Sequence, residues 1–177
     1  MNKDSKKFCS YMVRSSFIEY LDEDIIDFKL AYERQCHMIR VRKIAKKLVK
    51  NTPDLNLTKK QLEDLEMACY IHDVRKFSRG DHGDWGYHYV LKRLIDFGIK
   101  PARAFRISNL VKMHNKKVSY IRENVKNTDD LILYYLIKDS DTLDKIVNQG
   151  KDRKRELILK SSINLVEKNK ELFTITI

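Results

Sequence analysis

Apolar side chains recur at spacings of three and four residues along most of the chain, a pattern typical of helices that bury one face. The pattern predicts a short leading helix within residues 1–21 and a long helix from about 24 to 50, which ends before the Asn51-Thr52-Pro53 segment. Four more helices and a last amphipathic helix follow. The four are expected over about residues 58–77, 82–97, 101–114 and 131–148.

Residues that cap helices support these limits. Asp24 is expected to cap the long helix, and Thr58 with Gln61 three residues later forms a capping-box pattern. Pro101 suits the first position of its helix, and Thr128 is expected to cap the helix that follows it. A Lys-rich loop is expected between these last two helices.

Composition agrees with an all-α protein. The 177 residues include only 5 Gly and 2 Pro, too few for the tight turns that many short strands need. We therefore expect a single compact helical domain of about six to eight helices. Within it, residues 1–23 are expected to form a helix that packs on the core, 24–150 the core itself, and 151–177 a helix and a docked or frayed tail that cover it.

Charge and cysteine content indicate which partners and which cellular compartment to expect. The 36 Lys and Arg against 25 Asp and Glu give a net charge of +11, which favours anionic partners, although a solvated basic surface explains the charge equally well. The 3 Cys contain no C-x-x-C pair, as expected in a reducing compartment. No apolar run is long enough to span a membrane, and no signal-peptide segment is seen, so a cytoplasmic protein without membrane partners is expected.

Four of the 5 His lie at the apolar phase or at the end of a separate predicted helix. They are His37, His72, His82 and His114, and Asp73 directly follows the second of them. Burying several imidazoles and a carboxylate without partners is costly, and a divalent cation removes this cost, as in helical bundles with inward-facing ligands. Periodicity leaves both Asp139 and Asp141 open as a further carboxylate.

These residues together resemble a known signature. His37, then His72-Asp73, then Asp141-Thr142-Leu143 resemble the H…HD…D signature of the HD-domain metal-dependent phosphohydrolases. The residues beside them are also similar to the family pattern, and the resemblance covers about residues 30–148. These neighbours are Arg40-Val41, Lys76-Phe77 and the segment His82 to Gly86.

The resemblance implies an all-α fold and a metal site. It assigns the metal to His37, His72, Asp73 and Asp141, and it favours Asp141 over Asp139. In members with two metals, residues that match His82 and His114 serve the second ion and the HD-pair aspartate bridges both. The chain departs from the pattern at Asn115, where some such members have a second His, and at Arg75, where Gly is found. One or two ions are therefore expected, and Mn, Fe, Ni, Co, Zn and Mg are not distinguished.

The implied chemistry is hydrolysis of a phosphoester by a metal-activated water, with Asp73, His82 and His114 as catalytic residues. Arg75 and Lys76 are the expected contacts of the substrate phosphate. A nucleotide or a related small phosphorylated metabolite is the expected substrate. Two alternatives remain open: a nuclease or cyclic-nucleotide phosphodiesterase that cleaves diesters, and a non-catalytic, metal-stabilised nucleic-acid or regulatory binding module. The oligomeric state is also open.

Overall fold

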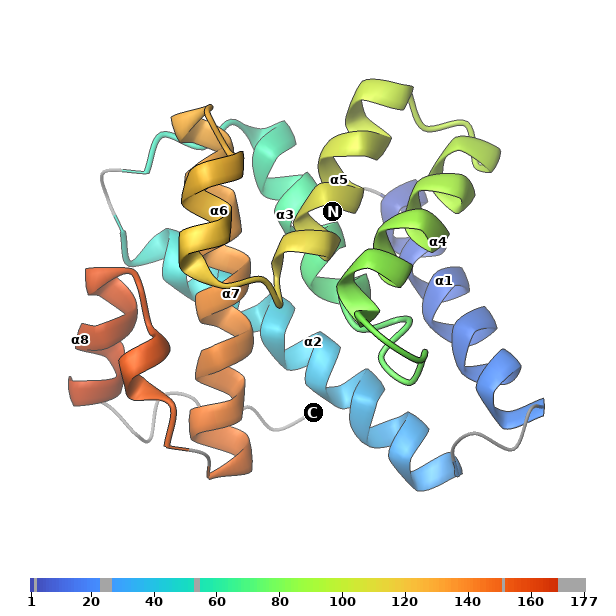
Figure 1. The fold of residues 1–177 in the computed structure, drawn as a ribbon, viewed down its shortest axis with the longest axis horizontal. Helices are drawn as coiled ribbons and strands as arrows, with labels where there is room; N and C mark the ends of the chain where they lie inside the picture. Colours follow the sequence, from blue (N-terminus) through green and yellow to red (C-terminus); the bar gives the residue numbers. More distant parts are fainter. Residues whose placement is uncertain (2, 23–26, 53–54, 151, 169–177) are drawn as a thin grey trace.

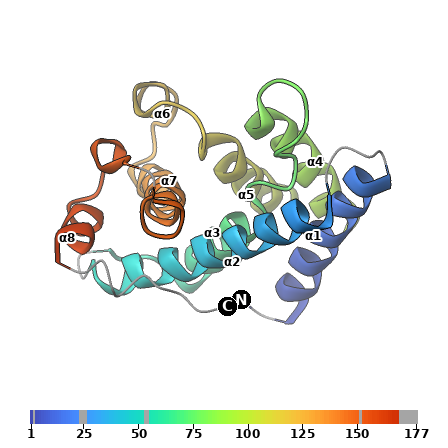
Figure 2. The same cartoon turned by 90° about the horizontal axis from the view of Figure 1, so that it is seen from below.

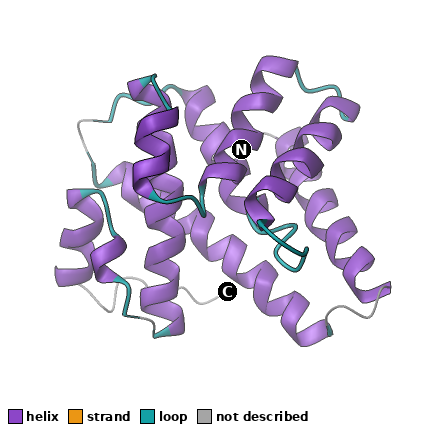
Figure 3. Cartoon of the chain, in the orientation of Figure 1, coloured by secondary structure: helices purple, strands orange, loops and turns teal. Residues whose placement is uncertain are grey.

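A computed structural model describes residues 1, 3–22, 27–52, 55–150 and 152–168, and within these ranges the chain forms eight α-helices and no strand (Figure 3). The all-α prediction and the expected number of helices are confirmed. The helices are α1 (Lys3–Asp22), α2 (Phe28–Lys50), α3 (Lys59–Ile71), α4 (His82–Asp96), α5 (Pro101–Met113), α6 (Val118–Asn124), α7 (Thr128–Gln149) and α8 (Lys160–Lys168), with a short 3₁₀ turn η1 (Lys154–Glu156) between the last two.

Local sequence explains most helix ends. The capping box of Thr58 and Gln61 is formed at α3, and Pro101 stands in the first turn of α5. The predicted cap at Thr128 is wrong by one residue: the Asn127 side chain accepts from the amide of Asp129 at 2.8 Å, and Thr128 is the first helical residue. Asn is preferred over Thr at the N-cap, and the backbone of Asn127 has the extended conformation that this position requires.

Two further expectations about helix ends differ from the structure or lie outside it. Helix α2 is capped by Asp27, whose carboxylate accepts from the amide of Leu30 at 2.7 Å, and Asp24 lies outside the described residues. The Lys-rich loop expected after α5 instead contains α6. Its seven residues have a single fully buried anchor, Ile121, so the helix is too short to show a periodic pattern. The expected tail at 172–177 also lies outside the described residues.

Helices α2, α3, α5 and α7 pack against one another at the centre of the molecule (Figures 1 and 2). Helices α1 and α4 lie on one side of this group, and α6 and α8 lie on the other. The core between the central helices is fully buried and aliphatic, with members such as Ile44, Leu65, Ile107 and Leu136. Burial of this surface is the main force that holds the helices together.

Buried ion pairs fix how the central helices are oriented. The Asp64 carboxylate of α3 is fully buried and accepts hydrogen bonds from Arg103 and Arg106 of α5. Glu66, also on α3, accepts from both Nε and Nη2 of Arg42 on α2, at 3.1 and 3.0 Å. Removing one partner of such a pair leaves a buried charge unpaired, so these contacts specify how the helices sit beside one another.

The ends of several elements meet at one place. Helix α3 ends at Ile71, α4 begins at His82 and α5 ends at Met113, and α2 and α7 pass alongside through their central turns. The turn that follows α3 is supported by α1, because the Ser16 hydroxyl donates to the Val74 carbonyl. None of the described helices is long and apolar enough to cross a membrane.

Candidate metal centre

The predicted histidines and carboxylates come together where these helix ends meet. The structure gathers His37 of α2, His72 and Asp73 after α3, His82 at the start of α4, His114 after α5 and Asp141 of α7. All except His82 are buried, and none of those is more than 4% exposed. Residues far apart in the sequence therefore form one polar cluster inside an aliphatic bundle.

Three of the imidazole rings have one nitrogen fixed by the protein. The Nδ1–H of His72 donates to the Cys69 carbonyl at 2.8 Å, and that of His114 donates to the Val111 carbonyl at 2.6 Å. A carbonyl can only accept, so these rings must carry their proton on Nδ1 when neutral. Their Nε2 atoms then present a lone pair to the cluster. The Nδ1 of His37 is likewise 2.7 Å from Oδ2 of Asp144.

The first group of facing atoms comprises His37, His72 and Asp141. The Oδ1 of Asp141 lies 3.1 Å from Nε2 of His37 and 3.7 Å from Nε2 of His72. Ligand atoms about 2.1 Å from one cation stand roughly 3.0 to 3.4 Å apart in octahedral or tetrahedral geometry. The observed spacings are close to this range, so a single ion fits among the three side chains.

Asp73 faces two groups of histidines with different oxygens. Its Oδ2 is 3.7 Å from Nε2 of both His37 and His72. Its Oδ1 is 3.3 Å from Nε2 of both His82 and His114, and these two nitrogens are 3.1 Å apart. A second group of possible ligands therefore adjoins the first, and the carboxylate lies between them. His72, Asp73 and His114 also form a set with ligand-like spacing.

Hydrogen bonding within the protein leaves the cluster unsatisfied. Four of its buried atoms have no hydrogen-bond partner of suitable geometry: Nε2 of His37, Nε2 of His72, Oδ1 of Asp73 and Oδ1 of Asp141. Buried polar atoms without partners are rare and costly, and here all four belong to facing side chains. Imidazole nitrogens and carboxylate oxygens are ligands for divalent cations such as Mn, Fe, Co, Ni and Zn. The residues present thus fit a metal.

The pKa values of the acidic residues follow from the same arrangement. Burial alone would raise the pKa of Asp73, but the charges and hydrogen bonds of His72, His114 and His82 hold it well below its usual range. Burial opposes ionisation of Asp141 too, and His37, His72 and Lys145 hold the pKa of that carboxyl well below its usual range. Both carboxylates are therefore ionised at neutral pH, as metal ligands need to be.

The exposed edge of the cluster is cationic. We call Arg34, Lys76 and Lys145 the cationic rim: their side chains are 20%, 28% and 16% exposed. The Nη1 of Arg34 donates to Oδ2 of Asp73 at 2.8 Å, and Nζ of Lys76 lies 3.7 Å from Oδ1 of the same residue. Lys145 forms an ion pair with Asp141. An anion that approaches the cluster meets these cations first.

The two predicted phosphate contacts lie in different surroundings. Lys76 belongs to the cationic rim, and its Nζ is 3.3 Å from Nε2 of His82. Arg75 instead packs its guanidinium over the ring of Tyr89, 5.2 Å from the centroid, and donates from Nε to Ser78. These contacts of Arg75 join the turn after α3 to α4.

The structure separates the two aspartates that periodicity left open. Asp139 and Asp141 are two positions apart on α7, so their side chains leave the helix on different faces. The Asp139 carboxylate accepts from the amides of Ile158 and Leu159, at 3.0 and 2.8 Å, and so holds the segment before α8. Asp141 faces His37 and His72. Asp139 is thus engaged elsewhere.

Two residues beside the cluster were missed by sequence reasoning. Arg34 contacts Asp73, and Asp144 accepts from Nδ1 of His37 as well as from Nε of Arg40 at 2.6 Å. Arg34 and Arg40 lie three residues before and after His37, and Asp144 lies three residues after Asp141. Their helical phase is the only signal in the sequence that could have found them.

Close contact of α4 with α5 sets the position of His82. A Cβ atom at Gly83 would lie 2.6 Å from the Lys112 carbonyl oxygen and 2.5 Å from Oδ1 of Asn115. Asn115 in turn donates to Oδ1 of Asp81 at 2.9 Å, and that same oxygen caps the first turn of α4. Asn115 stands at the position where some two-metal members of the resembled family have a second His. It joins the helix ends that carry His82 and His114.

One comparison with known proteins is informative. A family model of the HD domain matches residues 34–148, which is more than half of the chain and includes every residue of the cluster. The chain belongs to the HD-domain family. No curated protein and no solved structure matches it.

Membership of the HD-domain family relates the cluster to metal-dependent chemistry. HD-domain proteins are generally metal-dependent hydrolases, and divalent metals are their usual cofactors. In this HD domain, the histidines and aspartates gathered from α2, α3, α5 and α7 could hold such a metal. The matched range begins at Arg34 and ends at Asn148, so it includes the missed residues Arg34 and Asp144 as well as the signature itself.

Proposed function

We propose that the protein is a metal-dependent phosphohydrolase that cleaves a phosphoester of a nucleotide or a related small phosphorylated metabolite. The observation that supports this most is the set of four unpartnered, buried atoms of His37, His72, Asp73 and Asp141, which adjoin the cationic rim. Such a set has the donors for a divalent cation, and the rim has the charge to hold a phosphoryl group beside it.

His37, His72, Asp73 and Asp141 would hold the first ion, and His82 and His114 with Asp73 would hold a second. A divalent cation bound there lowers the pKa of water and polarises a phosphoryl oxygen. The Asp73 carboxylate, which faces both histidine groups, would accept a hydrogen bond from the attacking water and orient it.

His82 is the group suited to move a proton. Burial, His114 and Lys76 together lower its pKa below the ordinary value despite the nearby Asp73, so the ring is neutral at pH 7. Its side chain is 17% exposed, whereas those of the other five cluster residues are 0% to 6% exposed. In a one-metal version, His82 would accept a proton from the water and return it to the leaving oxygen.

The rim favours substrates with more than one negative charge. Arg34, Lys76 and Lys145 place three cations at the edge of the cluster. A phosphomonoester dianion or a polyphosphate gains more from this charge than a singly charged diester does. We therefore rank monoester or polyphosphate hydrolysis above a nuclease or cyclic-nucleotide phosphodiesterase activity.

A pocket beside the cluster suits a nucleotide-sized body. It has a volume of about 560 Å³, and its lining includes Arg34 and His37 as well as Tyr32. Pockets of this size are typical of small-molecule sites, and an aromatic ring offers a face for a base. This supports a nucleotide over a smaller phosphate ester as the substrate.

A turnover assay would test the proposal. Chelator-treated protein would be supplied with Mn, Co, Ni, Zn or Mg and offered mononucleotides, an aryl phosphate monoester, a bis-aryl phosphate diester, and single-stranded DNA and RNA. We expect hydrolysis of a monoester or a nucleotide with at least one metal. Asp73→Ala is expected to lose both bound metal and activity, whereas Asp129→Ala, an exposed change on α7, should keep both.

Other outcomes would replace the proposal. Turnover restricted to diesters or nucleic acid would favour the phosphodiesterase alternative. If no substrate were hydrolysed with any metal, and Asp73→Ala bound as much metal as the wild type, the hydrolase proposal would fail. Metal binding without hydrolysis, together with tight binding of nucleic acid, would favour a non-catalytic binding module.

A further inference from the structure

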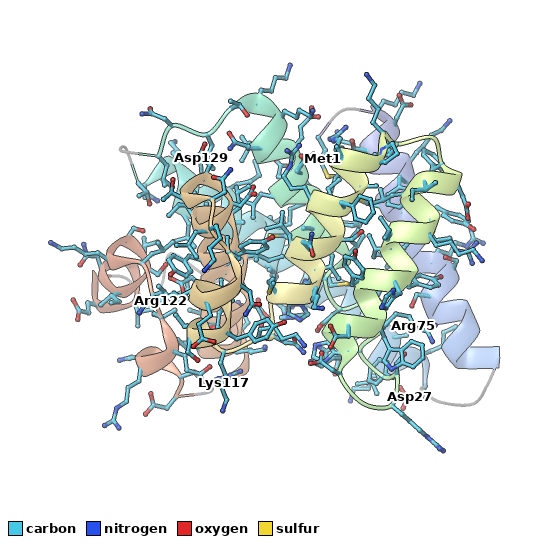
Figure 4. All side chains as sticks on the ribbon, turned by 45° about the horizontal axis from the view of Figure 1, so that its top comes forward. Met1, Asp27, Arg75, Lys117, Arg122 and Asp129 are labelled. Atoms are coloured by element: carbon cyan, nitrogen blue, oxygen red, sulfur yellow. The ribbon has the colours of Figure 1, made fainter. Side chains whose placement is uncertain are left out.

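A second pocket lies on the far side of α7 from α2. It has a volume of about 420 Å³ and lies between α6, α7 and the segment around η1. Its lining includes four cationic side chains: Lys117, Arg122, Lys138 and Arg155. Figure 4 shows Lys117 and Arg122 on the α6 side of the molecule, away from Arg75. None of the candidate metal ligands lines this α6–α7 pocket, so it is separate from the metal centre.

The α6–α7 pocket has an excess of positive charge. Within the described part of the chain, none of the four forms an ion pair with a carboxylate. Arg122 donates from Nε to the Tyr135 hydroxyl at 3.1 Å, which leaves its two Nη groups for another acceptor. The pocket also contains one acid, Glu156, but Arg153 already donates to both of its carboxylate oxygens. The net charge of the lining is therefore strongly positive.

Lys138 is the most informative of the four. It is half-buried on α7 and has no hydrogen-bond or ion-pair partner among the described residues. Burial lowers the pKa of Lys138, and the more distant charges of Asp141 and Glu156 only partly oppose this shift. A bound anion would remove this cost of burial. A fully solvated lysine would have no such cost.

The shape of the α6–α7 pocket is maintained by contacts outside it. Asp139 of α7 accepts from the amides of Ile158 and Leu159 and so fixes the wall that contains Leu157 and Ile158. Val118 adds a further apolar contact. A rigid wall, apolar patches and several convergent cations are the features of a small-molecule site rather than of a scattered basic surface.

We propose that the α6–α7 pocket binds the phosphoryl groups of a small phosphorylated molecule, at a site distinct from the metal centre. Arg122 would bind phosphoryl oxygens through both Nη groups, and Lys138 would supply a charge from α7. The volume accommodates a ligand of nucleotide size. This site does not require the proposed hydrolase activity, so the two proposals fail independently.

Inorganic pyrophosphate is a suitable probe. Its binding to the full-length chain would be measured calorimetrically in the presence of a chelator, so that the metal centre contributes no metal-bound phosphate. Lys138→Gln combined with Arg122→Gln should weaken binding by about tenfold or more, because two charged contacts are lost. The matched control, Lys60→Gln with Lys92→Gln, removes two exposed charges on α3 and α4 and should stay within about twofold.

Two comparisons make the test specific. Lys76→Gln removes one cation of the rim, and in this variant the affinity of pyrophosphate for the α6–α7 pocket should be unchanged. In a nuclear magnetic resonance titration, the amides of Val118 and Ile158 should shift and those of His72 and His114 should not. Equal losses in the pocket variant and its charge control, or a loss confined to Lys76→Gln, would overturn the proposal. Thermal unfolding of each variant verifies that it is folded.

A further comparison identifies the source of the phosphoryl groups. If they belong to the substrate, the pocket variant should raise KM for a triphosphate but not for a monophosphate. If they belong to a separate effector, KM should be unchanged for both, and the response of the activity to added effector should be lost. Pyrophosphate binding that is insensitive to the pocket variant contradicts both sources.

Discussion

The buried histidines of the metal centre each have one ring nitrogen bound by the protein. Backbone carbonyls accept from Nδ1 of His72 and His114, and Asp144 accepts from Nδ1 of His37. A carboxylate differs from a carbonyl because its charge makes the imidazole more basic and strengthens its bond to a metal. Asp144 is thus a positioning residue for His37.

Replacing Asp144 by Asn should weaken metal binding. The amide keeps the size of the side chain but loses the charge opposite His37 and Arg40, so we expect a loss of about 10- to 100-fold in metal affinity. Isothermal titration with Mn or Zn would measure this loss. Asp129→Asn makes the same chemical change at an exposed position of α7 and should have no effect. Equal affinities in the two variants would contradict the role given to Asp144.

Metal affinity should also depend on pH through His37. Burial alone would lower the pKa of this imidazole, but Asp141 and Asp144 raise it above its ordinary value of 6.5 in the metal-free protein. Below that pKa a proton must leave the ring before the metal can bind. Metal affinity therefore falls by up to about tenfold for each unit that the pH decreases. The carboxylates stay ionised over this range.

Titrations between about pH 6 and 8.5, in two buffers with different ionisation enthalpies, would count the protons released on binding. In Asp144→Asn the fall in affinity should begin at a lower pH, because one of the anions that raises the pKa of His37 is gone. An affinity that is constant from pH 6 to pH 8 would exclude His37 as the titrating ligand.

Some residues in and beside the cluster could be predicted from the sequence, and others could not. The histidines and Asp73 were found because polar residues at an apolar helical phase are unusual, and the signature gave them an order. Arg34 and Asp144 were not found, since their partners lie 39 and 107 positions away and no periodic pattern relates such distant residues. The preference for Asp141 over Asp139 came from resemblance alone, and the geometry now supports it as a proposed ligand.

At the level of elements, the contact of α4 with α5 controls the site. Glycine normally lowers helix stability relative to alanine, by roughly 0.5–1 kcal/mol, so Gly83 in the first turn of α4 needs a reason. The backbone of α5 supplies it, because the Lys112 carbonyl oxygen occupies the space of a Cβ. Glycine here allows an approach that brings His82 to His114.

Gly83→Ala should therefore destabilise the protein, against the usual effect of this substitution in a helix. We expect a loss of about 1–3 kcal/mol in the free energy of unfolding, because a methyl group would overlap with backbone atoms that cannot move away. Urea unfolding would measure it. His88→Ala places the same side chain at an exposed position of α4 and should change stability little. A stabilised Gly83→Ala variant would show that the helices can separate.

The sequence predicted a helix well where the helix is long or where its first residues carry a clear capping signal. Helix α3 was found with its capping box, and α5 with its proline, because both signals are local. Helix α6 was missed because seven residues with one buried anchor show no periodicity. The α4–α5 approach was not predictable either, since a glycine at a helix start gives no information about which element lies opposite.

For the whole molecule, the metal centre connects helices that also meet through apolar packing and buried ion pairs. His37, His72, His114 and Asp141 come from or directly follow four different helices, and the unpartnered atoms among them weaken the fold when no metal is bound. A cation that binds only the folded state must stabilise the whole domain by mass action. Stability thus becomes a measure of metal binding that does not require a substrate.

Metal at about 1,000 times its dissociation constant should stabilise the protein by about 4 kcal/mol relative to chelator-treated protein. In a chain of this size, this corresponds to a rise of roughly 8–16 °C in the thermal midpoint. Differential scanning calorimetry with Mn, Co or Zn would measure the shift. His72→Ala should lose most of it, because its Nε2 faces both carboxylates, whereas the exposed change Asp129→Asn should retain it. An equal rise in His72→Ala would place the stabilising ion elsewhere on the molecule.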